Sequence, residues 1–182
     1  MAKQFDRIED NHRVFIETQT MFFTGTAAAE GRVNISPKGM DSLRVLGPNR
    51  IIWLNYTGSG NETAGHLIKA NRITLMWCGF GKQPLILRCY GTARAVHPRD
   101  ADWAALVGHF GAPLGARQVY DVAVELVQTS CGFAVPYMEP AGERDTLKAW
   151  SVDRGDAIPD YWATRNTQTI DGFDTNILGD DT

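Results

Sequence analysis

Residues 21–56 read MFFTGTAAAEGRVNISPKGMDSLRVLGPNRIIWLNY, and the fold class can be inferred outward from this stretch. It contains four short runs that are rich in apolar residues, at 21–29, 32–37, 42–47 and 51–56. Glu30-Gly31 separates the first two runs, and Gly47-Pro48-Asn49-Arg50 separates the last two. Extended runs on either side of such turn residues predict two antiparallel β-hairpins.

Three later runs are also predicted to be strands, at 72–78, 85–96 and 117–128. Gly91 predicts a bulge or bend within the second of them. The third alternates, which predicts one face made of Tyr120, Val122, Val124 and Leu126 and another carrying Asp121 and Glu125. Six or seven strands with short turns predict an antiparallel barrel, because closure leaves few unpaired edges.

The remaining apolar periodicity predicts helices around this barrel. One helix is expected over 6–18, with Val14, Phe15 and Thr18 on one side, and another over 98–110. A third follows a loop at 57–63, and shorter helices are expected at 144–152 and 158–165. The sequence contains neither a repeat nor a linker, which predicts one domain over 1–182 with a C-terminal helical segment and tail from about 144.

Composition and charge exclude several classes of function. The chain has 182 residues, 43% hydrophobic content and a formal net charge of −3. This charge argues against a nucleic-acid partner, and no apolar run approaches the roughly 20 residues of a membrane span. The polar N-terminus predicts no signal peptide. Three widely spaced cysteines (Cys78, Cys89 and Cys131) suit a reducing compartment, so we expect a cytoplasmic protein.

Two segments contain candidate binding residues. Residues 57–63, TGSGNET, join an apolar strand to a helical pattern and offer free amides for a phosphate. Ser59 and Glu62 alternatively form a capping box, which needs no ligand, and the Glu62 carboxylate repels a phosphate unless it points away. In residues 34–39, Pro37 interrupts strand pairing, so Lys38 and nearby amides face either a ligand or solvent.

Other residue types give weaker signals. The four histidines (His12, His66, His97 and His109) lack the spacing of metal ligands, so no metal site is expected. No Ser-His-Asp arrangement is evident either, and no catalytic side chain is predicted. Trp150 and Trp162, in the C-terminal region, either cover a planar ligand or pack in the core.

Four segments, in this order, resemble the pyridoxamine 5′-phosphate oxidase-related, FMN-binding split-barrel family. They are FFTGTAAAEGRVNISPKG (22–39), IIWLNYTGSGNETAGHLIKANRITLMW (51–77), LILRCYGTARAV (85–96) and SCGFAVPYMEPAGERDTL (130–147). The tail RNTQTIDGF (165–173) resembles the ending of an uncharacterised branch of the family. The resemblance extends from about residue 12 to residue 174.

The resemblance implies a mainly β fold, a six-stranded antiparallel split barrel with peripheral helices. It also implies a homodimer with FMN in clefts at the subunit interface. The strand along the flavin ring would be Asn34, Ile35, Ser36, Pro37 and Lys38. Asn55 and Thr57 would lie beside the ring and ribityl chain, and Asn61 and Thr63 would lie at the phosphate.

The chain also departs from the family's pattern. Glu62 and Thr63 stand where the oxidases have an Arg-Lys pair, so we do not expect a typical pyridoxamine 5′-phosphate oxidase. Arg88 is a candidate replacement cation. Asn166, Ile170 and Asp171 are candidates for a C-terminal lid over the cleft.

The leading hypothesis is an FMN-dependent oxidoreductase that transfers hydride through the flavin to or from an unknown small substrate. Lys38 and nearby amides would stabilise the reduced flavin. Two alternatives remain open at this point. One is a non-catalytic module that binds FMN or haem, and the other is a reductase that uses a deazaflavin (F420) on the same fold.

Overall fold

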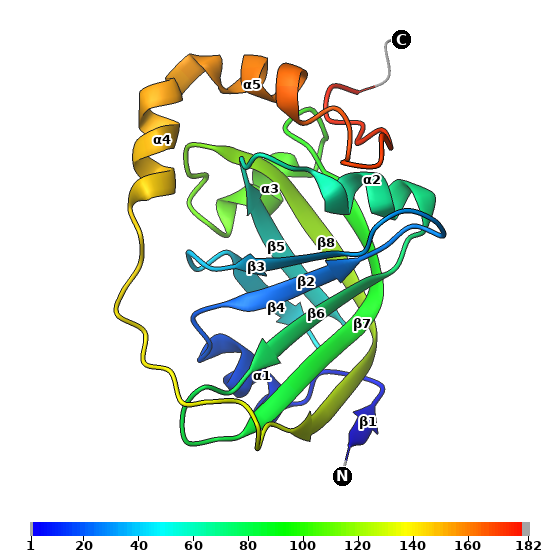
Figure 1. Ribbon diagram of the computed structural model, residues 1–182, viewed down its shortest axis with the longest axis vertical. Helices are drawn as coiled ribbons and strands as arrows, with labels where there is room; N and C mark the ends of the chain where they lie inside the picture. Colours follow the sequence, from blue (N-terminus) through cyan, green and yellow to red (C-terminus); the bar gives the residue numbers. More distant parts are fainter. Residues whose placement is uncertain (1, 180–182) are drawn as a thin grey trace.

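In the computed structural model, which describes residues 2–179, eight strands form one antiparallel sheet that curls into a barrel (Figure 1). The strand order is β3-β2-β6-β7-β8-β5-β4, with β1 paired to β8. The strands are β1 Lys3–Phe5, β2 Phe22–Thr26, β3 Asn34–Lys38, β4 Leu43–Gly47, β5 Arg50–Tyr56, β6 Ile73–Cys78, β7 Leu85–Val96 and β8 Ala116–Cys131. The mainly β fold and both predicted hairpins, β2-β3 and β4-β5, are confirmed.

The expected number of six strands is wrong, because the described chain has eight. The 16-residue β8 explains part of the difference. One edge of β8 pairs with β7, while its other edge pairs first with β5 and then, from Val127 to Thr129, with β1. β1 has only three residues, too few for an alternating pattern to be visible in the sequence.

A bulge between β7 and β8 changes which side chains of β8 face the core. Gly91 pairs with Val124 and Tyr90 pairs with Leu126, so the register shifts by one residue at the bend predicted for Gly91. A Cβ atom on Gly91 would overlap the Ala123 carbonyl oxygen, which explains the glycine. Beyond the bulge Val127 is buried, so the expectation that Leu126 continues the buried face is wrong.

Helices cover the outside and the ends of the barrel (Figure 1). They are α1 Asp10–Glu17, α2 Glu62–Lys69, α3 Trp103–Gly108, α4 Thr146–Arg154 and α5 Ile158–Arg165. The first is shorter than expected because the chain first forms β1, and Val14 lies exposed while Phe15 and Ile16 are buried. The helix expected over 98–110 has only six residues. Asp100 accepts the backbone N–H of His97 and holds the preceding residues in turns.

Two apolar clusters hold these elements together. The barrel interior includes Trp53 and Tyr120, whose rings stack with centroids 4.5 Å apart. Leu106 and Val107 of α3 pack on the outside of β5, β7 and β8 in a second cluster. Residues 132–145 run along one side of the barrel to α4, and α5 leads back over its end toward α2 (Figure 1). This path brings the C-terminal segment to the loop before α2.

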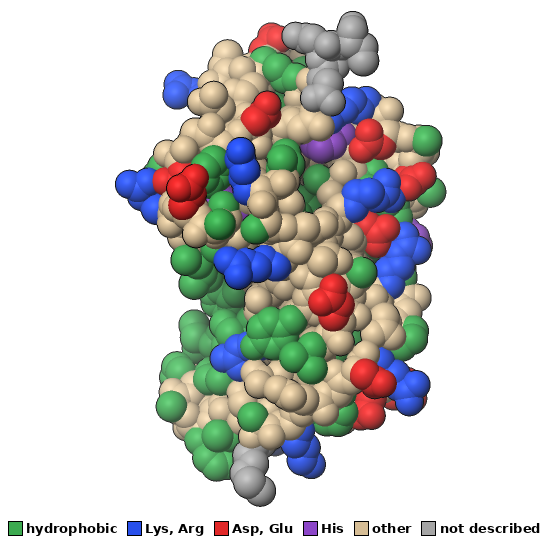
Figure 2. All heavy atoms as spheres, turned by 90° about the vertical axis from the view of Figure 1, so that its right-hand side faces the viewer, with side chains coloured by type: hydrophobic (Ala, Val, Ile, Leu, Met, Phe, Trp, Pro, Cys, Tyr) green, Lys and Arg blue, Asp and Glu red, His purple; other side chains and the backbone are tan. Residues whose placement is uncertain are grey.

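The surface carries charged side chains of both signs (Figure 2). Figure 2 shows basic and acidic side chains interspersed over one face, without a basic stripe. Among residues 2–179, no helix is both long enough and apolar enough to cross a membrane.

Candidate functional site

Two adjoining cavities lie where β3 ends, beside the loop that joins β5 to α2. They share Pro37, Lys38, Gly58 and Ser59 in their walls. The larger has a volume of about 970 Å³ and mostly apolar walls, whereas the smaller, of about 360 Å³, is mostly polar. Together they form a site with one apolar end and one polar end.

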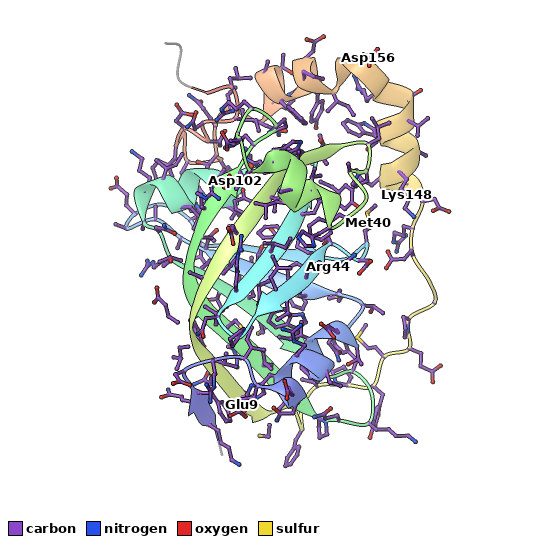
Figure 3. The ribbon with its side chains drawn as sticks, turned by 180° about the vertical axis from the view of Figure 1, so that it is seen from behind. Glu9, Met40, Arg44, Asp102, Lys148 and Asp156 are labelled. Atoms are coloured by element: carbon purple, nitrogen blue, oxygen red, sulfur yellow. The ribbon has the colours of Figure 1, made fainter. Side chains whose placement is uncertain are left out.

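The larger cavity lies between the barrel and the C-terminal helices. Met21 and Met40 line it from the barrel side, and Trp150 and Tyr161 line it from α4 and α5. Met40 and Lys148 of α4 are labelled in Figure 3 and mark these two sides. The rings of Trp150 and Tyr161 meet edge to face at 5.1 Å. This arrangement offers a flat apolar ligand two aromatic walls.

A hydrogen bond fixes α5 to the barrel beside this cavity. Trp162 Nε1 donates to Thr57 Oγ1 at 2.9 Å, and the Thr57 hydroxyl donates to the Gly115 carbonyl, also at 2.9 Å. Trp162 is therefore a structural residue here, and Trp150 is the tryptophan that faces the cavity.

Arg117, at the start of β8, lines the smaller cavity and is only 2% exposed. Its Nη1 donates to Asn166 Oδ1 at 2.7 Å and to the Gly58 carbonyl at 3.3 Å, while its buried Nε has no partner within the described chain. No carboxylate of residues 2–179 lies within 4 Å of this guanidinium. Burial lowers the pKa of Arg117 to about 10. A buried cation without a counter-ion favours an anionic ligand.

Lys38 adds a second positive charge at the junction of the cavities. Its Nζ donates to Asn55 Oδ1 at 3.3 Å and lies 5.1 Å from the centroid of the Trp53 ring. Burial and, secondarily, the charge of Arg117 lower the pKa of Lys38 to about 8. An anion between Lys38 and Arg117 would reduce this repulsion.

The loop before α2 does not form the capping box suggested by the sequence. Asn61, not Ser59, is the N-cap residue, and its buried Oδ1 accepts no hydrogen bond from the described residues. The Glu62 carboxylate instead accepts the backbone N–H of Ile170, at 3.1 and 3.2 Å. This bond ties the Glu62 carboxylate to the C-terminal tail, although Glu62 also lines the smaller cavity.

The structure brings together nine of the thirteen candidate site residues. The smaller cavity is lined by Asn34, Ser36, Pro37, Lys38, Asn55, Asn61 and Thr63. Thr57 lines the larger cavity beside them. Asn166 is fully buried and contacts the smaller cavity through its bond to Arg117.

Four candidates lie elsewhere. Ile35 is exposed and lines a separate apolar hollow on the other face of β3. Arg88, on β7, donates to Ser130 Oγ at 3.2 Å and lines neither cavity. The Ile170 side chain is exposed. The Asp171 carboxylate accepts the backbone N–H of Arg32 at 2.7 Å, pairs with its guanidinium and so has a lowered pKa.

Arg117 was missed by the sequence reasoning. It begins the run at 117–128, whose alternation identifies a strand but does not distinguish a buried arginine from an exposed one at the strand's end. One sequence feature could have identified it. Arg117 lies two residues before Val119, so the two side chains face the same side of the strand, and Val119 is completely buried.

Comparison with known proteins gives matches in both sequence and fold. Residues 8–131 match the family model described as pyridoxamine 5′-phosphate oxidase. The chain is 31% identical over 189 residues to the pyridoxamine 5′-phosphate oxidase family protein ustO of Aspergillus flavus, an alignment that covers 93% of this chain and 76% of that protein.

Solved structures share the fold at lower identity. A HupZ variant from Group A Streptococcus has a TM-score of 0.56 and 23% identity over 68% of this chain and 99% of its own. A putative pyridoxamine 5′-phosphate oxidase from Lactobacillus delbrueckii has a TM-score of 0.53 and 20% identity, over 68% of this chain and 94% of its own. HutZ of Vibrio cholerae, described as a haem storage protein, has a TM-score of 0.51 and 17% identity, over 69% of this chain and 97% of its own. The family model covers more than half of the chain and the fungal relative aligns over most of it, so the chain belongs to the pyridoxamine 5′-phosphate oxidase family.

Proposed function

We propose that this protein binds FMN and acts as a flavin-dependent oxidoreductase on a small substrate that is not a typical pyridoxamine phosphate. The observation that carries the proposal is the buried Arg117, which has no carboxylate partner among residues 2–179 and lies beside Lys38 in a polar cavity that adjoins a larger apolar one. FMN has the matching form, with an anionic phosphate at one end and a flat, largely apolar ring at the other.

The residues present fit this cofactor. Arg117 and Lys38 would hold the phosphate together with the free backbone amides at the start of α2, where Asn61 and Thr63 lie. Asn34, Ser36 and Asn55 offer polar atoms at the junction of the cavities. Pro37 and Trp150 would flank the ring. In this assignment Arg117 takes the role that the sequence reasoning gave to Arg88.

When bound, FMN supplies the hydride chemistry, and the chain supplies binding, orientation and electrostatics. Lys38 lines both cavities, so its charge would lie between the phosphate and the ring and would favour negative charge on a bound ring. Trp150 and Tyr161 form an aromatic wall on one side of the larger cavity. That cavity's size leaves room for a substrate beside the ring.

A homodimer is part of the proposal, with the cofactor sites at the subunit interface. Phe133 and Tyr137, in the segment along the side of the barrel, are both 83% exposed, and Val33 and Ile35 are exposed at the start of β3. Exposed apolar groups of this kind are typical of interfaces. Sedimentation velocity at micromolar concentration should give a mass near twice 20.1 kDa, and a monomer would contradict this part of the proposal.

The histidine positions favour FMN over haem. None of His12, His66, His97 and His109 lines either cavity of the described chain, so a haem bound there would lack a histidine ligand. The purified protein should therefore show flavin absorbance and no haem band. Apoprotein offered FMN and the deazaflavin in competition should bind FMN. A preparation that is colourless and binds no added FMN would overturn the proposal.

The sharpest test compares FMN with riboflavin, which lacks the phosphate. Wild-type protein should bind FMN at least about 100-fold more tightly, because two cations, one of them buried, interact with the phosphate. Arg117→Met should remove most of this advantage and keep riboflavin binding. Arg88→Met, a matched loss of an arginine outside both cavities, should change neither affinity. Anaerobic addition of NADH or NADPH then distinguishes an enzyme, whose flavin is bleached, from a storage module.

A further inference from the structure

A row of polar side chains runs from Lys38, at the junction of the two cavities, through the barrel wall to Asp100, which follows β7. Lys38 Nζ contacts Asn55 Oδ1 at 3.3 Å, and Asn55 Nδ2 contacts Gln118 Oε1 at 3.2 Å. Gln118 Nε2 lies 3.1 Å from His97 Nε2, and His97 Nδ1 lies 3.7 Å from Asp100 Oδ2. Asn55, Gln118 and His97 are all buried.

The strand register produces this alignment. Asn55 of β5 pairs directly with Gln118 of β8. His97 immediately follows Val96, the last residue of β7, which pairs with Val119 on the other edge of β8. Three neighbouring strands therefore bring the amide and imidazole groups into one row.

The chemistry of Lys38 fixes the direction of every bond in the row. An ammonium can only donate, so the Asn55 atom that faces it is the oxygen and Asn55 donates onward from Nδ2. Gln118 must then accept through Oε1, which also receives the Tyr120 hydroxyl at 3.3 Å, and donate through Nε2. His97 must accept at Nε2, so its proton is on Nδ1, facing the Asp100 carboxylate.

We infer that Gln118 and His97 are positioning residues for Lys38. His97 accepts from the Gln118 amide, which fixes Gln118 as the acceptor for Asn55, and the Asn55 carbonyl oxygen is thereby held toward the lysine ammonium. Without the acceptor at His97 Nε2, the Gln118 amide can rotate, and the Asn55 amide can then turn its NH₂ group toward Lys38. Two donors would face each other, and the ammonium would lose its only hydrogen bond within residues 2–179.

The environment of His97 agrees with a neutral imidazole. Burial is the main cause that lowers its pKa to about 4; the charges of Arg99 and Arg117 also lower it, and Asp100 opposes them. A neutral ring retains the lone pair at Nε2 that Gln118 requires. What Lys38 binds rests on the proposed function, whereas the order of donors and acceptors rests on contacts among the chain's own residues.

The first experiment reads the tautomer directly in the flavin-free wild-type protein. ¹⁵N-labelled histidine spectra at pH 7 should show His97 protonated at Nδ1 and unprotonated at Nε2. A ring protonated at Nε2 would overturn the inference. This measurement needs no variant.

The second experiment follows the Lys38 ammonium itself. The chain has five lysines, so the ¹³Cε signals of labelled lysine can be resolved, and Lys38→Met identifies the one of interest. In His97→Phe the pKa of Lys38 should fall by about 1, because a hydrogen bond to a charged group is lost. His97→Gln retains an acceptor and should restore the wild-type value.

The control is His12→Phe, which removes another buried histidine that lies on α1 and outside the row. It should leave the Lys38 titration unchanged, whatever it does to stability. An unchanged Lys38 pKa in His97→Phe would overturn the inference. Both measurements use flavin-free protein, so failure to bind FMN would refute the proposed function and leave this result standing.

Discussion

Arg117 and Asn166 are joined by a hydrogen bond of 2.7 Å between Nη1 and Oδ1, which connects the start of β8 to the C-cap residue of α5. The Asn166 amide also donates to the Gly58 carbonyl at 3.0 Å. One neutral side chain therefore orients the buried guanidinium and fixes the loop before α2. Because an amide carries no charge, the positive charge of Arg117 is not neutralised by the contact that holds it.

Asn166→Asp should convert this neutral contact into a buried ion pair. The new carboxylate competes with a phosphate for Arg117, so FMN affinity should fall at least about tenfold, while riboflavin affinity changes little. Fluorescence titration at fixed ionic strength measures both. Asn176→Asp, which makes the same charge change beside Arg99 in the same tail, is the matched control. Equal FMN affinity in wild type and Asn166→Asp would exclude a phosphate at Arg117.

Lys38→Ala should weaken FMN binding and leave the fold intact, because the lysine lies at the end of a short strand. In wild type the affinity should also fall as the pH rises through about 8, where the free ammonium loses its proton. The flavin phosphate stays a dianion over this range, so the lysine is the group that changes. Titrations between pH 7 and 9 should therefore show a slope in wild type that is absent in Lys38→Ala. Lys148→Ala on α4 is the control, and a slope that persists in Lys38→Ala would assign it to another group.

Much of the barrel follows from local patterns, because alternation and turn residues are properties of neighbouring positions. The two hairpins and the bulge at Gly91 are of this kind. Two other elements depend on contacts that a local pattern does not show. β1 forms because it pairs with β8, and α3 is short because Asp100 accepts the His97 backbone N–H and holds the preceding residues in turns. Alternation also could not reveal that the bulge exchanges Leu126 for Val127 in the core.

The candidate site also contains some residues that the sequence could identify and others that it could not. Lys38 and Asn61 could be nominated from their local segments, because a strand end with proline and a loop before a helix are visible in the sequence. The role of Arg117 depends on Asn166, which lies 49 positions later, and on the absence of a carboxylate near it in the folded, described chain. The Ile170 amide that Glu62 contacts likewise lies in a distant segment. Charge compensation between distant segments cannot be read from one segment alone.

Acid should destabilise the protein partly through His97. Its pKa is about 4 in the folded state and about 6.5 in an unfolded chain, so the unfolded state binds more protons between these values. The free energy of unfolding should therefore fall as the pH drops from 6.5 toward 4, by about 2 kcal/mol at pH 4.5 for this residue. Urea denaturation at pH 7 and pH 4.5 should show a smaller difference in His97→Phe than in wild type. Some pH dependence should remain, because burial also lowers the pKa of His12. An identical difference in both proteins would mean that folding does not lower the pKa of His97.

Gly65→Ala should separate the C-terminal tail from α2. A Cβ atom at Gly65 would overlap the Thr169 side chain and approach the carbonyl oxygens of Asp174 and Phe173 to 3.2 and 3.3 Å. The tail must then move, which disturbs the Ile170 amide that Glu62 accepts from and weakens the placement of Asn166. We expect faster proteolysis after residue 165 and FMN affinity reduced about tenfold or more, with the barrel still folded. Gly108→Ala, at the end of α3 with no atom within 4 Å of its added Cβ, is the control. If Gly65→Ala binds FMN as wild type does while its tail is cleaved, Arg117 does not need Asn166 to hold the phosphate, and the tail only packs against α2.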